Sequence, residues 1–149
     1  MFEEIVLRTM KEDDLRKVIP LYIDYYNNHE NCCWTEATAF KRIHQAFVME
    51  DAYCIIAEEK DEPVGFVLGC FQQYDDLLAF DIDEIVVKSS RQGHGLGTMM
   101  LQQLENDVRA KGAKLIQLTS VNDEMHHHFY GKLGFCNTTN LIGKNKFLG

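Results

Sequence analysis

The spacing of apolar residues over the first fifty positions changes from that of a strand to that of a helix. Residues 4–9 (EIVLRT) predict a strand, and Thr9 with Glu12 has the spacing of a capping box before a helix. Pro20 lies inside the helical pattern that follows, so we expect a kink or a break there. Thr35 is placed to cap a second amphipathic helix. This part of the chain therefore predicts one strand and two helices.

The middle of the chain has the character of three strands. They are expected at residues 52–57 (AYCIIA), 64–71 (VGFVLGCF) and 79–87 (AFDIDEIVV). Polar turns separate them, the first at residues 58–63 and the second at Asp75 and Asp76. Such short connections join neighbouring antiparallel strands, so we expect a three-stranded meander.

The last third predicts a helix, a strand and a shorter helix. The first helix follows a glycine-rich loop and continues to about residue 110, with Gly112 placed to end it. Its apolar face comprises Leu96, Met100, Leu104 and Val108. A strand at 114–119 and a helix at 123–133 follow, and residues 135–148 have room for two short strands. The order β-α-α-β-β-β-α-β-α-β-β predicts one mixed α/β domain over residues 1–149 (an α+β fold with a mixed sheet).

The composition excludes several classes of protein. A chain of 149 residues with 46% hydrophobic residues and two prolines is neither disordered nor of low complexity. Its 15 Lys and Arg against 23 Asp and Glu give a net charge of −8, which disfavours a dedicated nucleic-acid binder. We expect no membrane partner, because no apolar run approaches the ~20 residues of a membrane span and the first residues do not resemble a signal peptide.

Cysteines and histidines indicate neither a disulfide framework nor a metal site. The five cysteines are odd in number and form no CxxC pair, which favours a reduced, cytoplasmic setting. Residues 126–128 are consecutive histidines, but neighbours on a helix point ~100° apart and cannot converge on one metal ion. We therefore expect no metal.

Charge is unevenly distributed along the chain. Residues 1–84 carry 7 Lys and Arg against 19 Asp and Glu, a balance of −12, whereas residues 85–149 carry 8 against 4, a balance of +4. This asymmetry suggests an anion held by the C-terminal part and a cation met by the N-terminal part. The alternative is a chance drift of surface charge.

A loop rich in glycine, at residues 92–97 (QGHGLG), lies between a predicted strand and a predicted helix. Backbone N–H groups at such a helix start bind phosphate oxygens, and glycines allow a close approach. A Walker A loop is excluded, because no lysine precedes Thr98, and the dinucleotide pattern GxGxxG would need glycine at that position. A third pattern, Gln/Arg-x-x-Gly-x-Gly/Ala, is satisfied by Gln92, Gly95 and Gly97. A flexible loop without a ligand is the alternative.

With this loop, the sequence resembles the GNAT superfamily of N-acetyltransferases. Residues 82–110 match its strand–loop–helix motif for acetyl-coenzyme A, and Asn122 followed by residues 129–135 (FYGKLGF) matches its second block. The resemblance implies the GNAT acyltransferase fold and acetyl-coenzyme A as co-substrate. The coenzyme-binding residues that it implies are Ile85, Val86, Val87, Gln92, Gly93, His94, Gly95, Leu96, Gly97, Thr98, Asn122, Tyr130 and Lys132. Asn122 can instead, or in addition, cap the following helix.

Acetyl transfer to an amine needs a base for the amine and an acid for the leaving thiolate. Asp83 and Glu84 are the candidate bases, and Glu84 is the preferred one. Because adjacent residues of a strand point to opposite faces, we expect only one of the two to face the substrate. Alternatively, both only attract a cationic amine. The family motif implies Tyr130 as the acid, against the alternative of a core aromatic residue.

The resulting functional hypothesis is an N-acetyltransferase that moves an acetyl group from acetyl-coenzyme A to a primary amine. The acidic N-terminal part favours a cationic small molecule as the acceptor. Trp34 falls where the family lines its acceptor pocket, although a hydrophobic plug explains it equally well. The alternatives are a protein (lysine or N-terminal) acetyltransferase and a non-catalytic coenzyme-A-binding regulatory module. A homodimer is left open.

Overall fold

Eleven elements make up the part of the chain that the structure describes. The computed structural model describes residues 4–149 and divides into two compact units, of which the first extends to Thr119 and the second comprises Ser120–Gly149. The first unit contains β1 (Ile5–Thr9), α1 (Asp14–Lys17), α2 (Ile19–His29), α3 (Glu36–Phe47), β2 (Ile55–Glu59), β3 (Glu62–Gln73), β4 (Leu78–Val87), the 3₁₀ turn η1 (Ser89–Arg91), α4 (Leu96–Ala110) and β5 (Leu115–Leu118). The second contains α5 (Glu124–Lys132).

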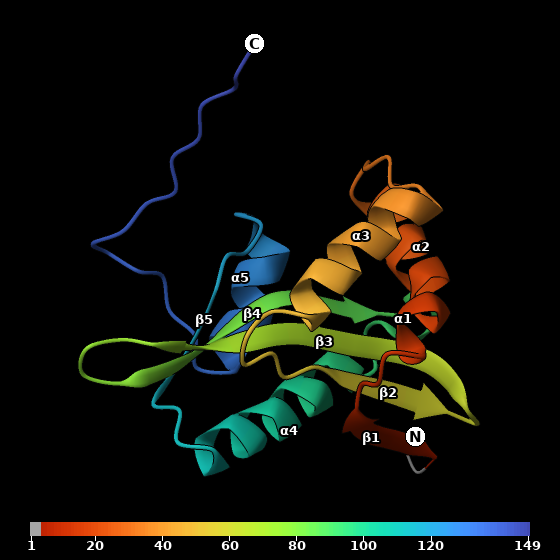
Figure 1. Cartoon of the computed structure of the whole chain (residues 1–149), viewed down its shortest axis with the longest axis horizontal. Helices are drawn as coiled ribbons and strands as arrows, with labels where there is room; N and C mark the ends of the chain where they lie inside the picture. The colour runs from red at the N-terminus through yellow and green to blue at the C-terminus, as the bar shows by residue number, and fades with distance from the viewer. Residues whose placement is uncertain (1–3) are drawn as a thin grey trace. The chain divides into compact units, whose positions relative to one another are not determined.

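The sheet of the first unit has the strand order β1-β2-β3-β4-β5 (Figure 1). The first four strands are antiparallel, which confirms the expected meander, and β5 runs parallel to β4. A parallel neighbour needs a crossover connection, which α4 supplies. The strand expected at residues 52–57 begins later, at Ile55, and Ala52 forms only an isolated bridge with Cys70. The mixed α/β fold inferred from the sequence is therefore confirmed.

Helices cover both faces of this sheet. Two consecutive residues of β3 contact helices on opposite faces of the sheet. A Cβ atom added at Gly65 would lie 2.9 Å from the sulfur of Met100 in α4, and the neighbouring Phe66 ring stacks on Tyr22 of α2. Side chains alternate along a strand, so α4 packs on one face and α2 with α3 on the other (Figure 1). Residues 64–70 of β3 are buried throughout, as expected for a central strand covered on both sides.

The helical pattern after β1 is divided into two helices. The break comes at Val18, and Pro20 lies in the first turn of α2, where its missing N–H costs no hydrogen bond. The expected capping box of Thr9 and Glu12 is wrong, because α1 begins only at Asp14.

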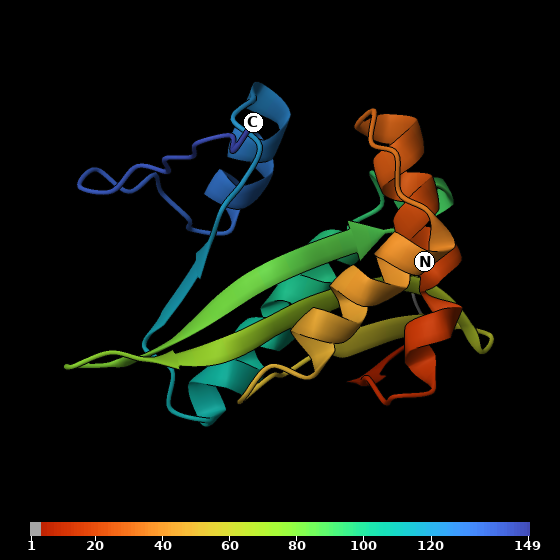
Figure 2. The same ribbon diagram turned by 45° about the horizontal axis from the view of Figure 1, so that its top comes forward.

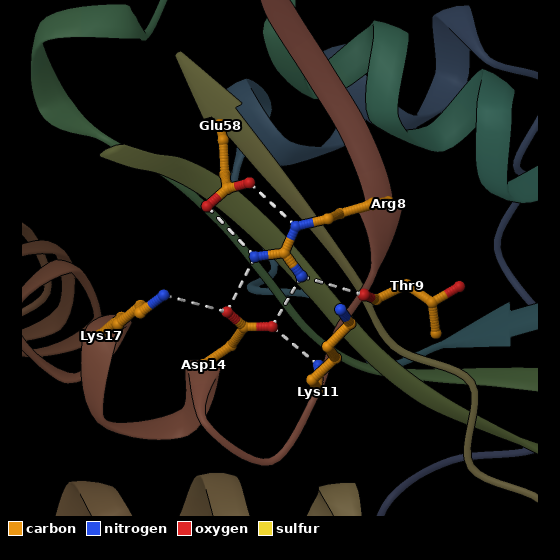
Figure 3. A network of polar contacts seen from close by, with 6 residues as sticks. All are labelled: Arg8, Thr9, Lys11, Asp14, Lys17 and Glu58. Carbon is orange, nitrogen blue, oxygen red and sulfur yellow. Dashed lines mark hydrogen bonds and ion pairs between the residues drawn. The ribbon is translucent and has the colours of Figure 1, made fainter. Parts of the chain in front are cut away.

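Arg8 joins β1 to both β2 and α1. Its guanidinium donates to the Glu58 carboxylate over 2.9 and 3.1 Å and to both oxygens of Asp14 over 2.8 Å (Figure 3). Asp14 also accepts the backbone N–H of Lys11 over 2.7 Å and is only 2% exposed. The hydrogen bonds from Arg8 lower the pKa of Asp14 to about 2. This network fixes the first helices against the sheet.

Two predicted helix boundaries are confirmed. Thr35 caps α3, with its hydroxyl accepting the N–H of Thr38 over 3.1 Å. Gly112, with a positive φ of 102°, follows the end of α4.

No helix among residues 4–149 is both long and apolar enough to cross a membrane.

The second unit differs from the sequence-based expectation in its last residues. Helix α5 forms as expected, but residues 133–149 contain no strand, so the two predicted strands are wrong. Apolar residues occur there as adjacent pairs, Leu141-Ile142 and Phe147-Leu148, rather than in the alternation that buries one face of a strand. These four side chains are 67–94% exposed.

Candidate active site

The glycine loop forms a helix start suited to an anion. Gly93 and Gly95 have positive φ values of 78° and 87°, a conformation that favours glycine, and Gly95 is the N-cap of α4. The first intrahelical bond is donated by the Met99 N–H to the Gly95 carbonyl. The N–H groups of Leu96, Gly97 and Thr98 therefore have no acceptor within the helix, and they lie at the positive end of its dipole. Phosphate oxygens are suitable acceptors for such groups.

The side chains of the loop contribute less than its backbone. Leu96 is 1% exposed and belongs to the core, so only its N–H is available to a ligand. The Gln92 amide donates to the Val87 carbonyl over 3.1 Å and thereby closes the loop onto the end of β4. Arg91, just before the loop, forms an ion pair with Glu59 of β2. His94 is exposed.

Strand β4 has an open edge that leads to this loop. All four residues of β5 pair with Ala79–Ile82, and β5 ends at Leu118, whereas β4 continues to Val87 (Figure 2). The Lys88 N–H donates to Val64 of β3, and antiparallel hydrogen bonds alternate, so the backbone groups of Val86 face β3. Those of Ile85 and Val87 consequently face the open edge. Of the three residues implied by the family resemblance, Ile85 can offer both backbone groups to a ligand and Val87 its N–H, because the Val87 carbonyl accepts the Gln92 amide.

A β-bulge lies next to this edge. Leu68 pairs with Glu84 and Gly69 pairs with Ile82, so Asp83 is an extra residue in β4. Gly69 is needed there, because a Cβ atom would lie 2.4 Å from the Asp81 carbonyl oxygen. The bulge interrupts the alternation of side chains.

Glu84 accepts hydrogen bonds from three side chains of the helices above β4. Its Oε2 accepts from the Tyr22 hydroxyl and from Arg42 Nε, each over 3.1 Å, and its Oε1 accepts from the Tyr26 hydroxyl. The carboxylate is only 9% exposed. Burial, followed by the charge of Glu84, raises the pKa of both tyrosines, so they remain neutral donors. Both oxygens of Glu84 are thus occupied.

Asp83 has a different environment. It is exposed, and no hydrogen bond to its carboxylate occurs within residues 4–149. Partial desolvation raises its pKa, the charge of Arg42 opposes this, and the charge of Asp81 adds to it. Arg42 therefore interacts with both members of the acidic pair. The alternation on which the sequence-based expectation for this pair rested is interrupted, because β4 is bulged at Asp83.

Tyr22, Tyr26 and Arg42 are site residues that no sequence pattern predicted. The two tyrosines fit the apolar pattern of their helix, which by itself gives no sign of a polar role. Their spacing of four residues does place both hydroxyls on one face of α2, which is a signal for a shared acceptor. Nothing in the sequence identifies that acceptor as Glu84.

The remaining predicted residues belong to the second unit. Asp123, rather than Asn122, caps α5 and accepts the His126 N–H over 2.8 Å. The Asn122 amide oxygen lies 2.7 Å from His127 Nε2. Tyr130 lies on α5, and Lys132 is the last residue of that helix. The Tyr130 ring packs edge-on against those of Phe129 and Phe135, with centroids 5.0 and 5.6 Å away.

Comparisons with known proteins agree with this geometry. Residues 15–135 match the acetyltransferase (GNAT) family. An uncharacterised N-acetyltransferase of Methanocaldococcus jannaschii is 23% identical over 142 residues, covering 91% of this chain and 62% of the relative, so this chain spans less than two thirds of that protein.

Solved structures share the fold at low sequence identity. A possible acetyltransferase of Clostridium difficile 630 has a TM-score of 0.83 and 12% identity, with 99% of this chain and 100% of that chain covered. A glucosamine-6-phosphate N-acetyltransferase of Arabidopsis thaliana has a TM-score of 0.72 and 19% identity, with 96% and 99% covered. The family match extends from the first helix to the end of the second block, and on this evidence the chain belongs to the GNAT family of acetyltransferases.

Proposed function

We propose that this protein is an acetyl-coenzyme A-dependent N-acetyltransferase that acts on a cationic primary amine. One observation carries the proposal: the open edge of β4 leads directly into a loop whose N–H groups lack intrahelical acceptors. An extended ligand that ends in phosphates fits this arrangement. Family membership identifies that ligand as acetyl-coenzyme A, which supplies the thioester acetyl group.

The backbone binds the ligand in this proposal. The N–H groups at the start of α4 hold the phosphate oxygens. The amide-containing arm of the coenzyme pairs with the backbone groups of Ile85 and with the N–H of Val87, as a peptide pairs with an exposed sheet edge. The Val87 carbonyl already accepts the Gln92 amide. An N–H group of the same edge stabilises the negative charge that develops on the thioester oxygen.

Asp83 is the base that the structure favours. A base needs an accessible carboxylate, and Asp83 is exposed, whereas Glu84 is buried and already accepts three hydrogen bonds. Desolvation raises the pKa of Asp83 and so strengthens it as a proton acceptor. In this proposal Asp83 takes the proton of the attacking amine, and Glu84 holds α2 and α3 on β4. The preference for Glu84 drawn from the sequence is thereby reversed.

Tyr130 is proposed as the acid on the strength of the family motif alone. In this role its hydroxyl donates a proton to the leaving thiolate.

The charge distribution favours a cationic acceptor. Close to the open edge of β4, the strand carries Asp81, Asp83 and Glu84, and Arg42 is the one cation that interacts with the acidic pair in the described structure. The balance of −12 over residues 1–84 extends this bias to the surrounding surface.

A thioester-cleavage assay over a panel of amines tests the proposal. We expect loss of the thioester absorbance with polycationic amines, at saturating acetyl-coenzyme A, and a lower kcat/KM as salt is increased. The optical readout avoids thiol reagents, which would react with the exposed Cys33 and Cys136. Turnover with peptides but not with small amines would indicate a protein acetyltransferase. Coenzyme binding without any turnover would indicate a regulatory module, and no coenzyme binding would refute the proposal.

A further inference from the structure

Ser89, in the turn η1, is bonded to two side chains of helix α2. Its Oγ donates to Asp24 Oδ2 over 2.9 Å and lies 2.9 Å from His29 Nε2. A serine hydroxyl has one proton, and Asp24 accepts it, so His29 Nε2 must be the donor in the second bond. The other Asp24 oxygen accepts from the Asn28 amide over 2.7 Å. Two side chains from the last turns of α2 therefore contact Ser89, and a third, Asn28, holds Asp24 in place.

These contacts hold the segment that comes just before the glycine loop (residues 92–97), which is the proposed coenzyme loop. Ser89 ties η1 to α2, and Arg91, at the other end of the same turn, ties it to Glu59 of β2. The loop that follows contains Gly93 and Gly95, which have no side chain with which to fix their own backbone. The direction of its N–H groups is therefore set by what holds the two ends of the loop: α4 on one side, and η1 with the Gln92 bond to Val87 on the other.

Helix α2 also bonds to the strand that leads into η1. Tyr22 and Tyr26 donate to Glu84 in β4, while Asp24 and His29 hold Ser89. One helix thus contacts both the strand beside the proposed base and the turn before the proposed phosphate loop.

We infer that Ser89 is a positioning residue for the coenzyme loop, and that Asp24 and His29 of α2 act through it on coenzyme affinity. The inference rests on the proposed function, because it assigns a role to contacts beside the proposed phosphate site. Ser89 itself need not touch the coenzyme. Its hydroxyl keeps η1 in place, so the loop N–H groups are already directed at the phosphates before binding, which lowers the ordering cost of binding.

The test compares neighbouring serines of the same turn. Ser89→Ala removes the two bonds, whereas Ser90→Ala removes an exposed hydroxyl for which the described structure shows no partner. The probe is coenzyme A itself, with its Kd measured by calorimetry for the full chain. We expect the Kd of Ser89→Ala to rise about 3- to 10-fold, the size expected when one or two net hydrogen bonds of about 1 kcal/mol each are partly transmitted. Ser90→Ala should retain the wild-type Kd.

Two further measurements separate positioning from a loss of stability. Hydrogen exchange of residues 92–97 in the free protein should be faster in Ser89→Ala than in Ser90→Ala, with both melting within a few degrees of wild type. Asp24→Ala should also raise the Kd, and combining it with Ser89→Ala should add little, because both changes break the same contact.

The inference is overturned if Ser89→Ala binds coenzyme A within twofold of wild type, or if Ser90→Ala weakens binding equally. Additive effects of Asp24→Ala and Ser89→Ala would also contradict it. A wild-type protein that does not bind coenzyme A would instead refute the proposed function, so the two failures are distinguishable.

Discussion

Glu84→Gln and Asp83→Asn are adjacent, chemically matched changes for which the structure predicts opposite effects. Glu84 accepts bonds from Tyr22, Tyr26 and Arg42 and is 9% exposed, so its replacement disrupts three donors at a buried site. Hydrogen bonds to a charged group contribute about 1.5–3 kcal/mol each. The glutamine oxygen retains one of them, and the partial exposure of Arg42 weakens another. We therefore expect a loss of about 2–4 kcal/mol in the free energy of unfolding.

The same comparison predicts little loss of stability for Asp83→Asn. Asp83 is exposed, and surface substitutions of this kind change stability by about 0.5 kcal/mol or less. For a chain of 149 residues, 1 kcal/mol corresponds to roughly 2–4 °C in the melting temperature. Glu84→Gln should thus melt about 5–15 °C below wild type, and Asp83→Asn within about 2 °C of it. Urea unfolding at pH 7 and calorimetry measure both.

For activity we expect the reverse: Asp83→Asn should lose more activity than Glu84→Gln. Asp83→Asn should lower kcat by about 10²- to 10⁴-fold, because the proposed base is lost. It should also remove the acidic limb of the kcat/KM profile. In wild type that limb lies at a higher pH than for an ordinary aspartate, because a base works only when deprotonated and the pKa of Asp83 is raised. The reasoning is refuted if Glu84→Gln melts within 2 °C of wild type, or if it alone removes the acidic limb.

Three other changes test the remaining parts of the structure. Gly95→Glu should abolish the rise in melting temperature that coenzyme A causes, because a side chain is strained at a φ of 87° and its charge repels phosphate; an undiminished rise would place the coenzyme elsewhere. Asp14→Asn should destabilise the protein at pH 7 by about 2–4 kcal/mol, since Arg8 and Glu58 lose their link to α1. Because the pKa of Asp14 falls from 3.8 to about 2 on folding, its contribution is full above about pH 4 and disappears as the pH falls toward 2, so wild type and variant should converge there in urea titrations. Tyr130→Phe should lower kcat by about 10²- to 10⁴-fold with an unchanged Kd for coenzyme A, and an unaltered kcat would make the tyrosine structural.

Local features of this protein could be predicted from the sequence because short segments encode them. Glycines at 93 and 95 allow a left-handed backbone before α4, and Thr35 caps α3 with a bond that spans only three residues. The spacing of apolar residues likewise predicted the meander and, apart from the division of the first helix into α1 and α2, the order of helices and strands up to α5. Each of these depends on neighbours a few positions apart, so their physical cause lies within the segment itself.

The roles of the acidic pair were decided only by the tertiary structure. The sequence of residues 79–87 predicts a strand without a bulge. Only the pairing of β4 with β3 shows that Asp83 is an extra residue. Glu84 accepts hydrogen bonds from side chains of α2 and α3, which lie 42 to 62 positions away in the chain. Ser89 bonds to His29 and Asp24, which lie 60 and 65 positions away in the chain. The environment of a buried or bridging polar group is set by whichever distant groups the fold brings to it, and no local preference of the chain encodes that choice.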